Sequence, residues 1–357
     1  MGKCSEFISE KRRSVDTPSK LVEDGQVVFG TFNKEFETLN ILDAKNPTKF
    51  PDFMKKLKLT LWEASEIHFK EGLLLVAVSD MSVFGITKAV FFDYRTRKVY
   101  TWDNTLQSKK TIIAPNLING SISEGITNNS NVRFTNNFEI GKAKVEGFSK
   151  NDIDIIEFNL SLKKLSNPSI VSIPFGVNRP LYSEKCFFQA TGYIEFNGER
   201  LLSDDESFAI IDDHKGYYPR KAHYDWLTAM GRLENGECIA FNLTRNQSIN
   251  QEEYNENIIW FKGKTSLLPP ITFTKDKDIK KTLNGEIQTV HINDEHGMVD
   301  ITYTVEKISA MITHALIVNI DYYITFGKIS GFIVDEDGNK YILDGFEGIG
   351  EDKTLLL

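Results

Sequence analysis

Cysteines and long apolar runs are both scarce in this sequence, and each shortage excludes a class of protein. The chain has 3 cysteines in 357 residues without C-x-x-C spacing, so we expect neither a disulfide framework nor a cysteine-based metal site. Cys186 and Cys238 lie in apolar contexts typical of buried thiols. No stretch approaches the roughly 18 apolar residues of a membrane-spanning helix. Residues 1–14 lack the apolar core of a secretory signal, so we expect a cytoplasmic protein.

Clustered positive charge is missing as well. Asp and Glu number 50 against 42 Lys and Arg, which gives a net charge of −8. Nucleic-acid binding needs clustered Lys and Arg, so we expect no nucleic-acid partner. The G-x-S-x-G elbow, the Walker loop and the G-x-G-x-x-G fingerprint are also absent from the sequence. We therefore expect no serine-hydrolase site, no nucleotide site and no cofactor.

The pattern that is present is alternation of apolar and polar residues at period two. It is clearest from Ile156 to Leu162 and from Val299 to Val305. This period places apolar side chains on one face of a strand and predicts half-buried antiparallel strands. Ile153 and Ile155 are out of phase with Ile156, which predicts a β-bulge if that strand is continuous.

Turn dipeptides punctuate these strands and predict tight hairpins. They are Asn197-Gly198, Asn235-Gly236, Asn284-Gly285 and Asp337-Gly338. A further hairpin is expected around residues 94–97, and short helices near residues 51–58 and 250–257. The pattern predicts a mostly β protein of two antiparallel barrels, or strongly curved sheets, packed side by side. A polar segment with Pro168 and Pro174 places the division between residues 1–175 and 176–357.

Several segments together resemble the bacterial domain-of-unknown-function family numbered 2804. In the second half they are Asp213-His-Lys-Gly-Tyr-Tyr-Pro-Arg220, Trp226, Ala240-Phe-Asn-Leu243, Glu256-Asn257, Trp260-Phe-Lys-Gly263 and Leu268-Pro-Pro-Ile-Thr-Phe273. Trp62-Glu63, residues 73–93 and the closing segments 326–331 and 345–348 are similar to the same family. The resemblance implies a lipocalin-like fold related to the AttH proteins and the carotenoid 1,2-hydratases. Relatives of this kind have two calyx-like barrels, and some act on long apolar or polyene molecules.

The segment from Asp212 to Arg220 is the strongest candidate site because it gathers carboxylates, an imidazole, an ammonium, phenols and a guanidinium. A loop of this kind can place an acid and a base near one ligand. The candidate catalytic residues are Asp213, His214 and Tyr217. The candidate ligand-binding residues are Lys215, Tyr218, Arg220, Trp226, Asn242, Glu256 and Asn257. The alternative is a structural corner in which Asp213 caps backbone N–H groups and pairs with Arg220.

Two further patterns bear on this site. The strand-like stretch after Arg220 should place His223 and Asp225 on one face, and Tyr224 and Trp226 on the other. Trp226 then either forms an apolar ligand wall or fills the core. The remaining histidines near the turn at residues 291–296 lack metal-ligand spacing, so no metal site is expected.

Three functions remain open at this point. The first is binding of a small, largely apolar molecule such as a lipid or terpenoid, with hydratase, isomerase or cyclase chemistry. The second is a non-catalytic carrier or interaction module. The third is carbohydrate processing by Asp212 and Asp213 with Glu256 or Glu347. We expect Asp213, Tyr217, Arg220 and Trp226 to converge on one site. A raised Asp213 pKa would favour proton donation, and a lowered pKa a structural ion pair.

Overall fold

The computed structural model describes residues 11–107, 110–314 and 319–356. The chain divides into two compact units, Val15–Tyr218 and Pro219–Leu357, and the second also takes the segment that ends at Ser14. The mostly β class is confirmed, with one nearly closed barrel-like sheet and one half-barrel sheet. The division follows Tyr218 rather than lying near residue 175. The reason is that strands after residue 175 pair with strands of the first unit.

The Val15–Tyr218 unit contains the barrel-like sheet. Its strands are β1 (Ser14–Val15), β2 (Val22–Glu23), β3 (Gln26–Val27), β4 (Gly30–Phe32), β5 (Leu59–Phe69), β6 (Gly72–Asp80), β7 (Phe84–Asp93), β8 (Lys98–Gln107), β9 (Thr111–Ile112), β10 (Ser121–Ile126), β11 (Ser130–Asn137), β12 (Lys142–Lys150), β13 (Ile155–Lys164), β14 (Ser169–Pro174), β15 (Pro180–Phe196), β16 (Glu199–Leu202) and β17 (Phe208–Tyr217). Its helices are the 3-10 turns η1 (Ile41–Asp43), η2 (Asp52–Lys58) and η4 (Phe138–Ile140).

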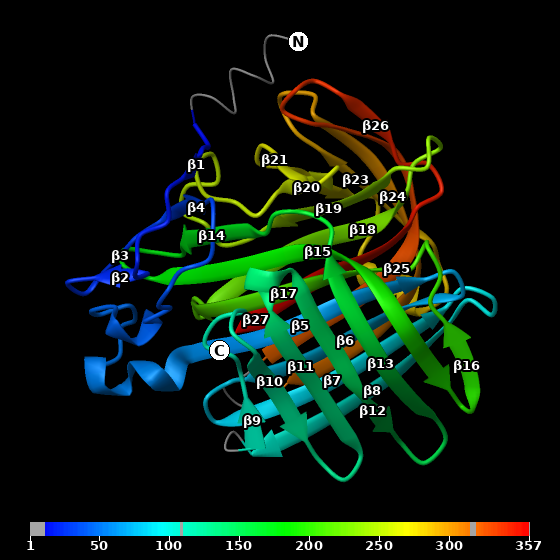
Figure 1. Ribbon diagram of the computed structural model, residues 1–357, viewed down its shortest axis with the longest axis horizontal. Helices are drawn as coiled ribbons and strands as arrows, with labels where there is room; N and C mark the ends of the chain where they lie inside the picture. The colour runs from blue at the N-terminus through cyan, green and yellow to red at the C-terminus, as the bar shows by residue number, and fades with distance from the viewer. Residues whose placement is uncertain (1–10, 108–109, 315–318, 357) are drawn as a thin grey trace. The chain divides into compact units, whose positions relative to one another are not determined.

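The main path of the barrel-like sheet runs β8-β7-β6-β5-β17-β15-β13-β12-β11-β10-β9, and β2 and β3 form a separate two-stranded sheet. Figure 1 shows β10 to β13 crossing over β5 to β8, so the sheet curls back over itself. Thr87 on β7 donates a 2.9 Å hydrogen bond to the Ser130 hydroxyl on β11, across the near closure. Ile67, Ile211 and Phe188 belong to the apolar cluster that fills the interior.

The Pro219–Leu357 unit contains the half-barrel sheet. Its strands are β18 (Lys221–Arg232), β19 (Cys238–Arg245), β20 (Ile258–Phe261), β21 (Lys264–Leu267), β22 (Thr272–Lys275), β23 (Gln288–Asn293), β24 (Val299–His314), β25 (Asn319–Val334), β26 (Lys340–Ile342) and β27 (Glu347–Leu356), with the helix α2 (Ile279–Leu283). They follow the order β21-β20-β19-β18-β27-β25-β24-β23-β22. Leu227, Ile292 and Ile333 lie in the core of this unit.

The period-two patterns became strands as predicted. Alternate residues of β13 are buried from Ile156 to Leu162, and those of β24 from Val299 to Val305. The bulge expected near Ile155 is wrong because β13 begins there, after a turn in which the Asn151 N–H donates to the Asp154 carbonyl. A register shift instead lies within β24, between Val305 and Lys307.

The turn and helix predictions have mixed outcomes. Asn197-Gly198, Asn235-Gly236 and Asp337-Gly338 join successive strands, as does the turn at residues 94–97. Asn284-Gly285 instead follows α2 in the long connection between the paired strands β22 and β23, so no tight hairpin turn forms there. The helix expected at residues 51–58 is η2, but residues 250–257 form only turns. Across the described ranges, no helix combines the length and apolar character needed to cross a bilayer.

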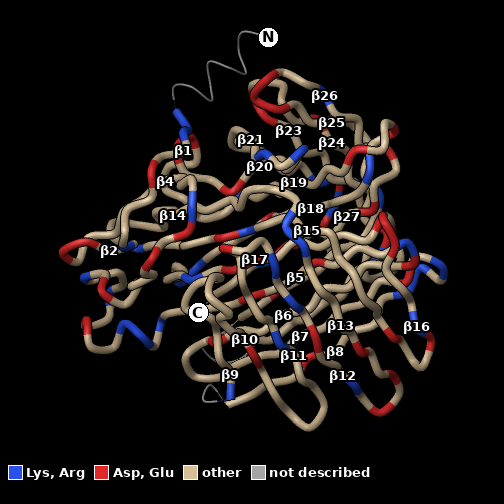
Figure 2. The backbone as a smooth tube through the Cα atoms, in the orientation of Figure 1, with Lys and Arg blue, Asp and Glu red and all other residues tan. Residues whose placement is uncertain are grey.

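Acidic and basic residues are interspersed along both units (Figure 2).

Candidate functional site

The segment predicted to be a polar loop is largely a strand. Residues from Phe208 to Tyr217 form β17, and every one of them is buried. β17 pairs with β5 on one side and with β15 on the other. Successive side chains of a strand point to opposite faces, so the polar residues here divide into two groups. The loop reading was wrong because Gly216 and Pro219 mark the end of the strand and not a corner within it.

One face of β17 carries a line of three carboxylates across adjacent strands. Asp213 is directly opposite Glu63 on β5 and Glu184 on β15, and all three are fully buried. Directly opposed residues in a sheet share a face. Two residues before Asp213 on that face, Ile211 belongs to the barrel's apolar core. We call Glu63, Asp213 and Glu184 the inner carboxylate row.

Each member of the row has a polar neighbour, but two oxygens have none. The Lys215 ammonium donates to Asp213 Oδ2, and the Tyr182 hydroxyl donates to Glu184 Oε2 at 2.7 Å. Asp213 Oδ1 and Glu184 Oε1 are buried and accept no hydrogen bond from the residues that the structure describes. Buried polar atoms are nearly always satisfied, so two bare oxygens on neighbouring strands are unusual.

Glu63 is held more completely than its neighbours. Its Oε2 accepts a 2.5 Å hydrogen bond from the Ser123 hydroxyl, and its Oε1 accepts one of 2.8 Å from the Asn136 amide. Both partners come from β10 and β11, across the barrel interior. These bonds fix the orientation of the Glu63 carboxyl group. Asp213 and Glu184, in contrast, each keep one oxygen that accepts no hydrogen bond from the described residues.

Glu184 should be mostly protonated and Glu63 partly protonated at neutral pH. Burial raises the pKa of Glu63 to about 7 and that of Glu184 to about 8, and in both cases nearby carboxylates add to the rise. Burial also raises the Asp213 pKa, although the Lys215 charge opposes this. Desolvation penalises a charged carboxylate more strongly than a neutral one. The raised Asp213 pKa is the direction that favours proton donation over a purely structural ion pair.

We expect Glu63→Gln to change how stability depends on pH. The free carboxyl group ionises near 4.5 and the folded one near 7, so the folded protein binds more protons between these values. Glu63 therefore contributes stability below about pH 4.5 that is lost as the pH rises through 7. The variant lacks this loss, and its stability relative to wild type should rise by about 3 kcal/mol from pH 4.5 to 8.

Denaturant unfolding at both pH values measures this difference. Glu157→Gln, at an exposed position of β13, is the matched control and should show no such trend. A stability difference between Glu63→Gln and wild type that stays flat with pH would contradict the raised Glu63 pKa.

The opposite face of β17 carries a second group. His214 Nε2 lies 3.1 Å from Asp212 Oδ1 and 3.1 Å from the Lys185 ammonium, which also pairs with Asp212. The His214 ring stacks on Trp62, with centroids 4.9 Å apart, and Trp62 also stacks on Tyr218. His214 and Tyr218 are thus brought together, but on the face away from Asp213. Asp212 and Asp213 likewise cannot act from the same side of the strand.

Tyr217 and Arg220 have different surroundings again. Tyr217 shares the face of Asp213 but packs in an apolar cluster with Leu59 and Tyr182. Arg220 is exposed, and the cation bonded to Asp213 is Lys215 rather than Arg220. Asp213 and Tyr217 belong to one compact unit, and Arg220 and Trp226 to the other. Their convergence on one site therefore stays a prediction.

The candidate ligand-binding residues after Trp226 form a chain of hydrogen bonds. Trp226 Nε1 donates to Asn242 Oδ1 at 2.6 Å, and Asn242 Nδ2 donates to the Glu256 carbonyl at 2.9 Å. Glu256 Oε2 accepts a 3.2 Å bond from Asn246. The Asn257 amide bridges the Thr244 N–H and the Pro269 carbonyl. Asn257 therefore braces the backbone, which sequence reasoning did not anticipate.

The Pro219–Leu357 unit also contains an ion network around Asp225, which the sequence analysis did not predict as a group. Asp225 and His223 share a face of β18 as predicted, with His223 Nε2 3.2 Å from Asp225 Oδ2. Lys275 donates to Asp225 Oδ1 at 2.5 Å and to Asp352 Oδ2 at 2.7 Å, and Arg245 donates twice to Asp225. The hydrogen bond with His223 and the charge and hydrogen bond of Lys275 keep the Asp225 pKa low, at about 2, against the effect of burial.

His223, Asp225 and Asp352 offer ligand atoms within 4.8 Å of one another. The Lys275 ammonium already bridges the two carboxylates, so it supplies the positive charge that a metal ion would bring. We interpret this group as an ion network that joins β18, β22 and β27. His291, expected not to bind metal, lies 3.2 Å from the Thr302 hydroxyl through Nδ1.

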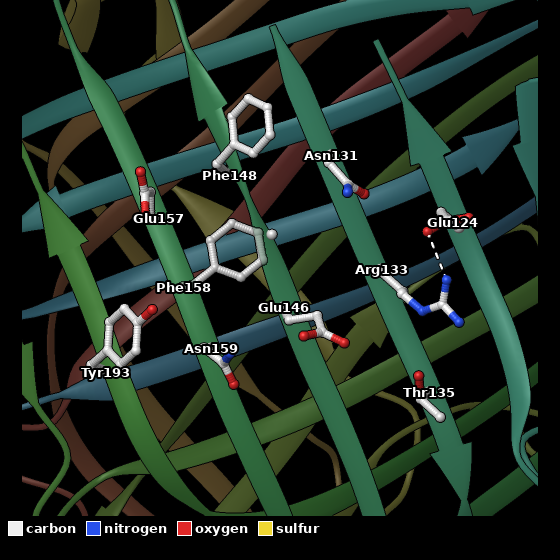
Figure 3. A pocket seen from close by; sticks show the side chains of 11 residues that line it. Glu124, Asn131, Arg133, Thr135, Glu146, Phe148, Glu157, Phe158, Asn159 and Tyr193 are labelled. Carbon is white, nitrogen blue, oxygen red and sulfur yellow. Dashed lines mark hydrogen bonds and ion pairs between the residues drawn. The ribbon is translucent and has the colours of Figure 1, made fainter. Parts of the chain in front are cut away.

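A polar hollow of about 570 Å³ lies over β10 to β13 and β15 (Figure 3). Its walls include Arg133, which donates to Glu124 at 2.9 Å, together with Tyr193 and Phe148. Glu146, also in the wall, pairs with Lys144 at 2.7 Å. No member of the inner carboxylate row lines this hollow. Paired, partly exposed charges are typical of a solvated surface, so we do not place the candidate site here.

Comparison with known proteins gives a family and a fold. The model of a family described as "Domain of unknown function (DUF2804)" matches residues 12–355. The structure is similar to a putative AttH from Nitrosomonas europaea, with 12% identity, a TM-score of 0.52, and coverage of 85% of this chain and 96% of that one. It also matches kievitone hydratase from Nectria haematococca, with 12% identity, a TM-score of 0.48, and coverage of 83% and 88%. No curated protein matches the sequence.

Proposed function

This chain belongs to the DUF2804 family, whose name assigns no reaction, and we propose that its Val15–Tyr218 barrel acts on a small, largely apolar molecule by acid–base catalysis. The inner carboxylate row carries the proposal. Three carboxylates buried side by side are costly to fold, and such groups with raised pKa values cluster at functional sites. A carrier that only bound an apolar ligand would need no ionisable groups there.

The carboxyl oxygens of Asp213 and Glu184 that lack hydrogen bonds suggest which residue donates a proton and which accepts one. Glu184, with a pKa near 8, is protonated at neutral pH and is the proton donor. The Lys215 ammonium bonded to Asp213 stabilises its ionised form, so we assign Asp213 as the proton acceptor and not as the donor that its raised pKa alone would favour. Glu63 is a positioning residue because Ser123 and Asn136 occupy both of its oxygens. This assignment keeps Asp213 from the sequence-based prediction and replaces His214 and Tyr217 with Glu184 and Lys215.

A hydratase reaction at this row would add water across a carbon–carbon double bond. The Glu184 carboxylic acid gives its proton to one carbon of a C=C bond, and the other carbon becomes a cation. Water attacks that cation, and Asp213 takes the proton that the water releases. Return of a proton from Asp213 to Glu184 restores the starting state of both carboxyl groups, and the net change is addition of water. An isomerase would instead lose a proton from a neighbouring carbon to Asp213, which moves the double bond without adding water.

The apolar substrate class follows from what surrounds the row. On the same barrel face Ile67, Cys186 and Ile211 belong to the apolar core, and each is essentially inaccessible to solvent. A low-polarity site strengthens the interaction between a buried acid and the charge that develops on a substrate. A carbohydrate would instead need many hydrogen-bonding partners, and these aliphatic and thiol side chains offer few.

Isotope incorporation tests the proposal. Purified wild-type protein is incubated in D₂O with an apolar extract of its expression host, and mass spectrometry measures deuterium gained by each compound. Wild type should label at least one compound. Asp213→Asn and Glu184→Gln should each slow labelling by roughly 100-fold or more, because general acid–base groups contribute about that much. Glu157→Gln should label at the wild-type rate.

Native mass spectrometry of the same variants shows whether ligand binding is kept. Equal labelling by wild type and both variants would overturn the catalytic assignment. Retained ligand with no labelling by wild type would favour the carrier.

A further inference from the structure

An exposed apolar patch lies at the start of β5. Phe50, Phe53 and Leu57 stand in or beside η2, with 42%, 86% and 51% of their surfaces exposed. Val83 and Phe84, at the turn between β6 and β7, are 71% and 38% exposed. We call these five residues the apolar patch. Exposed large apolar side chains that gather in one place usually mark an interaction surface.

Hydrogen bonds show that the two parts of the apolar patch are neighbours. The Ser82 hydroxyl donates to the Lys56 carbonyl at 2.6 Å and to the Leu59 carbonyl at 2.8 Å. The turn that carries Val83 is thereby tied to the end of η2. All of these residues belong to the Val15–Tyr218 unit. Figure 1 shows η2 within the blue coils that lead into β5.

Lysines are concentrated in the segment that carries Phe50, Phe53 and Leu57, in a chain that is acidic overall. Lys49, Lys55, Lys56 and Lys58 all fall within ten residues, whereas the whole chain has a net charge of −8. The carboxylate in this segment, Asp52, is neutralised by Lys55 at 3.0 Å. The Lys58 ammonium lies 5.1 Å from the centre of the Phe50 ring. Basic and aromatic side chains are therefore intermixed on one short segment.

We propose that the apolar patch docks this protein on the surface of a lipid bilayer that carries anionic headgroups. Aromatic and aliphatic side chains enter the boundary between headgroups and acyl chains, while Lys ammonium groups stay at the headgroup level. Each Lys near an anionic surface gains attraction that an uncharged surface does not offer. An acidic protein surface would complement the lysines but would leave Phe53 and Val83 without an apolar environment.

The apolar patch is also close along the chain to the inner carboxylate row. η2 ends at Lys58, β5 begins at Leu59, and Glu63 is four residues further on, which spans about 13 Å at the usual rise of a strand. An apolar molecule taken from a bilayer would enter the unit near this end of β5. The docking proposal does not depend on the proposed reaction, because it rests on the surface alone.

Co-sedimentation with vesicles tests the docking. Wild-type protein should bind vesicles of phosphatidylcholine with about 30% phosphatidylglycerol and bind pure phosphatidylcholine at least fivefold more weakly. Phe53→Ala should weaken binding to the anionic vesicles roughly tenfold, since a buried Phe contributes this much or more. The double variant Lys49→Gln and Lys56→Gln should also weaken it roughly tenfold, and raised salt should abolish that difference.

Matched controls keep the test specific. Ile153→Ala removes a side chain that is 87% exposed elsewhere in the unit. Lys150→Gln with Lys163→Gln removes two exposed charges from β12 and β13. Both controls should bind as wild type does. Failure of wild type to bind anionic vesicles, or equal loss in Phe53→Ala and Ile153→Ala, would overturn the proposal. The proposal would also be overturned if wild-type protein did not bind vesicles but bound an acidic protein through Lys56.

Vesicle binding needs no substrate and isotope labelling needs no vesicles. Failure of the docking test therefore does not contradict the proposed catalysis, and failure of the labelling test does not contradict the proposed docking.

Discussion

Lys215→Met is expected to lower the free energy of unfolding by about 3–5 kcal/mol at pH 8, because it leaves a buried carboxylate without its cation. Lys215 is 3% exposed and donates to Asp213, which is fully buried between Glu63 and Glu184. Methionine fills a similar volume, so the loss reports on charge more than on packing. At pH 5 the loss should be smaller, since Asp213 can then take up a proton and become neutral.

Denaturant unfolding at pH 5 and pH 8 measures both values. Lys163→Met, at an exposed position of β13, should change stability by less than about 0.5 kcal/mol. A loss for Lys215→Met that is equally large at both pH values would mean that Asp213 is not the group left unpaired.

Asp225→Asn is expected to lower the free energy of unfolding by about 2 kcal/mol at pH 7, because the partly exposed Lys275 and Arg245 cations lose the buried anion that they share. The Asp225 side chain is 1% exposed and accepts hydrogen bonds from Lys275 and Arg245. Asp300→Asn, at an exposed position of β24, is the matched control and should leave stability almost unchanged.

The Asp225 contribution should depend on pH in the opposite sense to that of Glu63. Its pKa is about 2 in the folded protein and 3.8 ordinarily, so the folded state favours the ionised form. The stability gained from this difference, about 2 kcal/mol, is present above pH 3.8 and is lost as the pH falls through 2. The gap between wild type and Asp225→Asn should therefore narrow by about that amount from pH 5 to pH 2. A gap that widens in acid would contradict the network.

The β class was predictable because its signal, the alternation of apolar and polar residues, lies within single short segments of the sequence. Apolar residues at every second position of β13 and β24 face a core whatever the rest of the chain does. Asn197-Gly198 adopts positive φ at both positions, which is the backbone that its tight turn requires. Helix α2 was missed because its five residues are too few to establish a helical period.

The candidate site was only half predictable, because its other half comes from strand pairing between distant segments. Asp213 and Lys215 were singled out from the density of polar residues around them. Glu184 has no local pattern that marks it, and it reaches Asp213 only through the β15 and β17 ladder. Glu63 offered one signal, a carboxylate directly after Trp62 in the mostly apolar start of β5. Both faces of β17 are buried, so alternation could not distinguish a catalytic face from a structural one.

The pairing of β5 with β17 also has a consequence for how the chain is made. The Ser65 hydroxyl donates to the Ile210 carbonyl, and these residues are 145 positions apart. At a ribosomal rate of about 5–20 residues per second, β5 waits roughly 7–30 s for its partner strand. During that interval the β5 edge and its acidic side chains have no partner strand, and any chaperone that shields nascent chains would meet them there. The waiting time should make the yield of folded protein sensitive to translation speed between residues 70 and 217.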